Sequence, residues 1–170
     1  MKVVFLDIDG VLNSHRTCIA FGGIPHTTAR NGRAALDEVA IRLIGGIARA
    51  AGAQIVLSST WRKHSDWKAI GPDLDLPIID RTPSGLGPRG QEIADWLAEH
   101  PEVENYAIID DDGDMLPEQL PFFVHTNYRD GFIWEHAECL AKLMGISIYD
   151  VNHPAQRVPV PTQNLEWGEK

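Results

Sequence analysis

The feature that most constrains the fold of this chain is its start, where an apolar run leads directly into two carboxylates. Residues 3–6 are all apolar, and Asp7, Ile8 and Asp9 follow at once. A short run without alternating polar positions is typical of a parallel strand that is buried on both faces. Because ligands bind at the carboxyl ends of such strands in open α/β sheets, Asp7 and Asp9 are expected where chemistry takes place.

Two ionised carboxylates at one strand end repel each other and lose hydration unless a cation joins them. A hard cation with oxygen ligands, such as Mg²⁺, is the expected solution. The alternative is a plain turn after a strand, formed by Asp9 and Gly10. The segment Asp7-Ile-Asp9-Gly10 alone does not decide between a metal site and a plain turn. The other motifs of the chain are needed for that decision.

The composition fits one globular domain. The 170 residues are 44% hydrophobic and 23% charged, enough for a core of ordinary size. Apolar runs are only strand-length and no leader pattern is evident, which predicts a cytoplasmic protein without a membrane segment. Cys18 and Cys139 match neither a disulfide framework nor a zinc site. The net charge of −9 argues against a broad nucleic-acid-binding face but leaves room for a local basic groove.

Apolar segments alternate with helical patterns along the chain. The predicted strands cover residues 3–6, 54–57, 77–79, 106–109 and 122–125. The predicted helices cover residues 36–51, 61–70, 90–99 and 132–144. Residues 13–33 lack periodicity and predict an irregular loop or small hairpin. This alternation predicts a parallel sheet covered on both faces in one domain, residues 1–149, with a proline-containing tail over 150–170.

Four polar features follow predicted strands or begin a predicted helix. They are Asp7-Ile-Asp9, Ser58-Ser-Thr-Trp-Arg62, Arg89 and Asp110-Asp111. Their order along roughly residues 1–145 resembles the haloacid dehalogenase (HAD) superfamily of phosphotransferases. Each feature alone is a weak signal, and the specificity comes from all four in sequence.

Within that superfamily the chain is similar to the small HAD domains of Swiss Army Knife RNA repair proteins, and more distantly to polynucleotide 3′-phosphatase domains. The segments that carry this similarity are Phe5-Leu-Asp-Ile-Asp-Gly-Val-Leu12, Val56-Leu-Ser-Ser-Thr-Trp-Arg62, Arg89-Gly-Gln-Glu-Ile-Ala-Asp-Trp-Leu97 and Ile108-Ile-Asp-Asp-Asp112. The resemblance implies a Rossmann-like three-layer α/β sandwich with a five-stranded parallel sheet and little or no cap. It also implies a Mg²⁺-dependent phosphatase that works through an aspartyl phosphate.

The acidic residues divide the expected chemistry. Asp7 is the candidate nucleophile, and Asp9 is the candidate acid that protonates the leaving oxygen and then activates water. Gly10 lets the chain turn tightly beside the phosphate. The family pattern implies a metal site formed by Asp7, the backbone carbonyl of Asp9, Asp110 and Asp111. The residues do not say which of Asp110 and Asp111 ligates the metal directly.

Hydroxyl and guanidinium groups are candidates for phosphate binding. Ser58 offers a hydroxyl, and Ser59 with the following backbone N–H groups opens a helix whose end favours an anion, the alternative being a simple helix cap. Arg62 is suited to a bidentate fork on the phosphate, or else is a solvated surface side chain. Arg89 stands where the superfamily usually has lysine, so the charge is kept in a different shape.

Two other kinds of acidic site compete with this interpretation. A calcium loop over residues 110–114 is disfavoured, because the glycine is misplaced for an EF-hand and Pro121 occupies the twelfth position. A receiver-type signalling module would be phosphorylated on Asp80 after the third strand. That module needs a lysine after the fifth strand, where Thr126 and Asn127 stand.

The substrate is constrained less than the chemistry. The stretches 12–55 and 62–89 are too short for a full cap, and an open site suits a large partner such as an RNA or DNA end. A small-molecule or nucleotide phosphatase is the alternative. The candidate contacts to a flanking nucleic-acid backbone are Arg16, Arg30, Arg33 and Arg62.

Aromatic residues are weaker candidates. His125 is either a substrate contact or a histidine satisfied by the fold. Trp61, Trp96 and Trp134 are expected in helices as core packing, not as platforms for base stacking.

Overall fold

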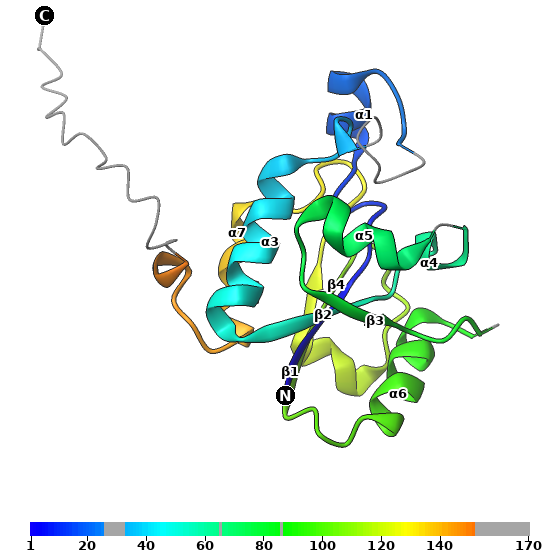
Figure 1. The fold of residues 1–170 in the computed structure, drawn as a ribbon, viewed down its shortest axis with the longest axis vertical. Helices are drawn as coiled ribbons and strands as arrows, with labels where there is room; N and C mark the ends of the chain where they lie inside the picture. The colour runs from blue at the N-terminus through cyan, green and yellow to red at the C-terminus, as the bar shows by residue number, and fades with distance from the viewer. Residues whose placement is uncertain (26–32, 65, 86, 152–170) are drawn as a thin grey trace, which may run out of the picture.

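The computed structural model describes residues 1–25, 33–64, 66–85 and 87–151. Its centre is a five-stranded, all-parallel sheet in the order β3-β2-β1-β4-β5 (Figure 1). The strands are β1 (Lys2–Leu6), β2 (Ala53–Leu57), β3 (Ile78–Arg81), β4 (Asn105–Asp110) and β5 (Phe123–His125). The predicted strand number and parallel direction are confirmed, and all five strands lie within two residues of their predicted bounds.

Helices cover both faces of this sheet. The helices are α1 (His15–Phe21), α3 (Glu38–Ala51), α4 (Trp61–His64), α5 (Trp67–Leu74), α6 (Arg89–Glu99) and α7 (Trp134–Leu143), with 3₁₀ turns η1 (Pro117–Phe122) and η2 (Ile148–Asp150). One core cluster joins α3, α5 and α7 to the sheet, and a second joins α6 to the opposite face. The three-layer α/β sandwich expected from the sequence is confirmed (Figure 1).

The side chains of β1 alternate between the two cores. Leu6 packs in the cluster under α3 and α7, whereas Phe5 packs in the cluster under α6. The rings of Phe5 and Trp96 pack edge to face, with their centroids 5.4 Å apart. Leu6 and Phe5 are both fully buried. This burial on two faces is the physical reason that the strand has no polar alternate positions.

The strand order places the functional edge of the sheet. β1 pairs with β2 on one side and with β4 on the other, and Leu6 is in register with Leu57 and Ile109. From β1 the chain adds β2 and β3 on one side of the sheet, and then adds β4 and β5 on the other side. The boundary between β1 and β4 is therefore the topological switch point, where open α/β sheets bind ligands. Asp7 and Asp110 lie at the carboxyl ends of the two strands that flank this point.

The structure corrects three local predictions. Residues 13–25 contain helix α1 in place of the predicted loop or hairpin, and Ser14 caps it. The single helix predicted over 61–70 is two helices, because Asp66 caps α5 through the Lys68 N–H. Trp134 is 46% exposed and is not a core residue.

Helix α1 was missed because it carries no apolar stripe facing the core. Its Ile19 and Phe21 are 84% and 57% exposed, so the residues have no helical hydrophobic period to detect. The predicted tail begins inside η2, and residues 152–170 lie outside the described part, so the boundary at 149 stays a prediction. No helix among the described residues is both long and apolar enough to span a membrane.

Candidate active site

Three carboxylates meet at the carboxyl edge of the sheet. Oxygen atoms of Asp7, Asp110 and Asp111 lie within 4.8 Å of one another, and the Asp7 and Asp110 residues are only 4% and 1% exposed. The backbone N–H of Asp7 donates to the carbonyl of Ile109 at 3.0 Å, which extends the β1–β4 pairing up to the site. The sequence correctly placed these groups at one edge, and the structure brings their side chains together.

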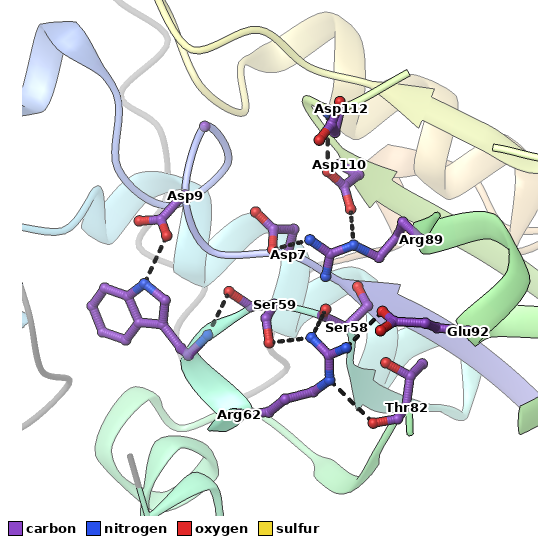
Figure 2. A network of polar contacts seen from close by, with 12 residues as sticks. Asp7, Asp9, Ser58, Ser59, Arg62, Thr82, Arg89, Glu92, Asp110 and Asp112 are labelled. Atoms are coloured by element: carbon purple, nitrogen blue, oxygen red, sulfur yellow. Dashed lines mark hydrogen bonds and ion pairs between the residues drawn. The ribbon is translucent and has the colours of Figure 1, made fainter. Parts of the chain in front are cut away.

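Arg89 supplies positive charge to this cluster. Its guanidinium lies 3.5 Å from Oδ1 of Asp7 and 3.3 Å from Oδ2 of Asp110 (Figure 2). Helix α6 begins at Arg89 and packs closely on the segment before η1, because Gly90 has no side chain. A Cβ at Gly90 would lie 2.6 Å from the backbone nitrogen of Leu116. The structure therefore places Arg89, which stands where the superfamily usually has lysine, against the carboxylate cluster.

The electrostatics of the cluster favour a cation. The pKa of Asp7 is raised from 3.8 to about 8, mainly by burial and then by the Asp110 carboxylate, while Arg89 opposes the rise. Burial likewise raises the pKa of Asp110 to about 6. Oδ2 of Asp110 is buried and meets Arg89 as an ion pair without a hydrogen bond, and Nη1 of Arg89 also has no hydrogen-bond partner. The clustered carboxylate oxygens are the donor type that Mg²⁺ prefers, so these residues fit such an ion.

Gly10 shapes the wall of the site. Its φ of +72° lies in the left-handed region, and a Cβ there would lie 2.1 Å from Cγ of Asp111. Its N–H donates to Oδ1 of Asn13 at 3.1 Å, and its carbonyl accepts from Thr126 at 2.9 Å. Gly10 therefore holds the turn against Asp111. Its contact with substrate stays a prediction.

Asp9 lies beside the carboxylate cluster, and its side chain is not a member of it. Nδ2 of Asn13 donates to Oδ1 of Asp9 at 2.7 Å, and Nε1 of Trp61 donates to Oδ2 at 2.9 Å. Both carboxylate oxygens thus accept an N–H. Ligation of a metal by the Asp9 carbonyl stays a prediction.

The two serines after β2 have different surroundings. Burial raises the pKa of Asp7, and the Ser59 hydroxyl opposes that rise through a hydrogen bond. Oγ of Ser59 also accepts from the Trp61 N–H at 3.4 Å, so it caps α4 as well. Oγ of Ser58 is buried without a hydrogen-bond partner. The structure therefore brings Ser59 to Asp7, and the catalytic role of Ser58 stays a prediction.

Arg62 differs from both sequence-based interpretations. It is 1% exposed, so it is not a solvated side chain. Its N–H groups donate to the carbonyl oxygens of Ser58, Ser59, Thr82 and Pro83 and to the carboxylate of Glu92. With every donor used inside the protein, Arg62 has none left for a bidentate phosphate contact. It braces the loop after β2 against the loop after β3.

Two of the other candidate contacts to nucleic acid are in ion pairs. Arg16 is ion-paired with Asp37, and Arg33 pairs with Glu38 at 3.1 Å. Arg30 lies outside the described residues. His125 does reach the site, where its Nε2 lies 3.1 Å from the Asp111 carbonyl.

The receiver-type alternative does not fit this arrangement. Its phosphorylated residue, Asp80, lies in β3 at the edge of the sheet and accepts from Nε1 of Trp96 at 2.7 Å. The clustered carboxylates belong to β1 and β4.

Sequence reasoning missed three groups in the site, one of which is Asn13, a donor to Asp9. Glu92 binds Arg62 at 2.6 Å, and Trp61 donates to Asp9. Trp61 was taken for core packing, and it is indeed 8% exposed, but its N–H faces the site. The only available signal was its position inside the Ser58–Arg62 motif.

A parallel sheet in this order, with acidic residues after β1 and β4, a serine pair after β2 and a cation at the start of α6, has the features of the HAD superfamily. The model of the family described as the HAD domain in Swiss Army Knife RNA repair proteins matches residues 3–137. The chain therefore belongs to this family. No curated protein and no solved structure matches it.

Proposed function

We propose that this protein is a Mg²⁺-dependent phosphomonoester hydrolase that works through an aspartyl phosphate on Asp7. The observation that carries the proposal is the cluster of Asp7, Asp110 and Asp111 within 4.8 Å, with Arg89 ion-paired to two of its members. Family membership supports the same conclusion, since HAD domains include phosphatases.

Each residue has a definite part in the two half-reactions. Asp7 forms a bond to phosphorus as the bond to the leaving oxygen breaks, and Asp9 gives that oxygen a proton. Asp9 then takes a proton from the water that cleaves the aspartyl phosphate, which releases inorganic phosphate and restores the Asp7 carboxylate and the protonated Asp9. Arg89 offsets negative charge on the phosphoryl oxygens. The Ser59 hydroxyl lowers the pKa of Asp7 and so favours the ionised form of the nucleophile.

The residues that would hold Mg²⁺ are Asp7, Asp110 and Asp111. When bound, the ion would neutralise their mutual repulsion and the charge of the phosphoryl group. Full occupation would also remove the need for a proton on Asp7, whose pKa burial raises to about 8.

The substrate that we propose is a nucleic-acid 3′-phosphate end in the cytoplasm. Its support is the family description, together with an open site. Between β1 and α3 the described residues contain only the short helix α1 as a possible cover. The two cysteines are free, which is consistent with a reducing compartment.

A small phosphorylated molecule or nucleotide is the second candidate substrate. The ion pairs of Arg16 and Arg33 and the enclosure of Arg62 favour it, because much of the positive charge expected at flanking phosphates already faces carboxylates of the protein. With a net charge of −9, attraction of a polyanion has to come from elsewhere.

The test is phosphate release from a panel of substrates with Mg²⁺ and with excess chelator. The panel holds 3′- and 5′-phosphorylated oligonucleotides, nucleotides and sugar phosphates. We expect release that depends on Mg²⁺ and is lost in Asp7→Asn by several orders of magnitude. The matched control is Asp95→Asn, since Asp95 is exposed on α6 and bonds only Gln91 among the hydrogen bonds of the described residues.

Full activity in excess chelator would remove the metal from the mechanism, and near wild-type release by Asp7→Asn would remove the nucleophile. A mononucleotide 3′-phosphate hydrolysed as efficiently as an oligonucleotide at low salt, or a preference for a sugar phosphate, would select the small-molecule alternative.

A further inference from the structure

Asp9 is held by two donors from different parts of the chain. Asn13 belongs to the turn that follows β1, and Trp61 begins α4 after β2. Trp61 is 52 positions from Asp9 in the sequence, yet its Nε1 lies 2.9 Å from Oδ2. Asn13 reaches Oδ1 at 2.7 Å. The carboxylate therefore bridges two loops at the mouth of the site.

Both donors are rigidly placed. Asn13 is fully buried, and its Oδ1 accepts from the Gly10 N–H at 3.1 Å, so its amide orientation is fixed. Trp61 is 8% exposed and packs in the core cluster under α3. A ring fixed by packing holds its N–H in one direction, which removes rotational freedom from the carboxylate that it binds.

We propose that Trp61, together with Asn13, is a positioning residue for proton transfer by Asp9. The two N–H groups fix the plane of the carboxylate, and each oxygen keeps a second lone pair for the proton that it transfers. Neither residue touches the reacting atoms. The role rests on the proposed function, because it requires Asp9 to act as acid and base.

The first test is Trp61→Phe, which keeps most of the ring and removes the N–H. The measured quantity is kcat/KM, which covers the steps up to departure of the leaving group. We expect a loss of about 10- to 100-fold for an alkyl phosphate, whose departing oxygen needs a proton, part of the contribution of acid catalysis. For p-nitrophenyl phosphate, whose leaving group needs little protonation, we expect a loss below about threefold.

Trp96→Phe is the matched control. Trp96 is 3% exposed and its Nε1 also donates to a carboxylate, Asp80, at 2.7 Å, but on the edge strand away from the carboxylate cluster. The Trp96→Phe variant loses an indole-to-carboxylate hydrogen bond and the same side-chain volume as Trp61→Phe does. We expect it to keep wild-type efficiency on both substrates, so that a general effect of destabilisation is separated from positioning.

The second test repeats Trp61→Phe in the Asp9→Asn background with p-nitrophenyl phosphate and the alkyl phosphate. With no acid to position, the second substitution is expected to add less than about twofold. If Trp61→Phe does not fold, Asn13→Ala carries the same comparison of leaving groups, since it removes the other donor.

Equal losses on both substrates in Trp61→Phe, or a full additional loss in the Asp9→Asn background, would overturn the positioning role while leaving the phosphatase proposal intact. A wild-type protein that hydrolyses no phosphomonoester with Mg²⁺ would instead refute the proposed function, and the role of Trp61 would fall with it.

Discussion

The stability of the metal-free protein is expected to fall as pH rises, because Asp7 is forced to keep a proton. Burial raises the pKa of Asp7 from 3.8 to about 8. In the unfolded chain the Asp7 carboxyl has its ordinary pKa of 3.8 and is ionised at neutral pH. In the folded protein it stays protonated until the pH approaches about 8. The native state therefore binds more protons than the unfolded state within this window, and the free energy of unfolding decreases with pH.

The slope follows from one proton per molecule. Each pH unit between the two pKa values costs about 1.4 kcal/mol, so a rise from pH 6 to 7.5 should lower the free energy of unfolding by roughly 2 kcal/mol. The assay is urea unfolding in excess chelator at several pH values. Saturating Mg²⁺ should flatten the slope, since a cation takes the place of the proton, and its stabilising effect should grow with pH.

Asp7→Asn separates this effect from other titrations. An amide does not ionise, so the variant should lose most of the slope and be more stable than the wild type at pH 7.5 without metal. Asp95→Asn, the exposed control on α6, should keep the wild-type slope. If the wild-type slope were flat in chelator, or equally steep in Asp7→Asn, the buried-carboxyl argument would be wrong.

Three further outcomes are expected. Glu92→Gln leaves the buried guanidinium of Arg62 without its charge partner, 2.6 Å away, and should lower the free energy of unfolding by about 3 kcal/mol in urea titration. Gly10→Ala places a methyl group where Asp111 stands and forces a positive φ, so Mg²⁺ should no longer raise the melting temperature. Arg89→Lys, which keeps the charge, should retain measurable phosphate release, whereas Arg89→Met should lose at least about 100-fold.

Each of these three predictions can be contradicted by a simple result. A stable Glu92→Gln protein would mean that Arg62 finds another partner. Normal Mg²⁺ stabilisation in Gly10→Ala would mean that Asp111 is not a ligand. Equal activity of the Arg89→Lys and Arg89→Met variants would take the positive charge out of catalysis.

The sequence by itself determined the sheet and the edge at which the site lies. Residues 3–6 are apolar at every position because β1 is buried on both faces, and that pattern is visible in one dimension. Parallel strands end at one edge, so Asp7 and Asp110 could be placed together without knowing any side-chain contact. Arg89 was found in the same way, as the first residue of a helix that follows a strand.

Only the tertiary structure decided what each polar side chain binds. Arg62 was expected to meet phosphate, but it lies among carbonyl groups of the loop after β3 and pairs with Glu92, 30 positions away. Trp61 joins Asp9 across 52 positions. Such pairings depend on how loops from different strands pack against one another. No local period or propensity records them, because the periodicity of a sequence reports which face is buried and not which neighbour is met there.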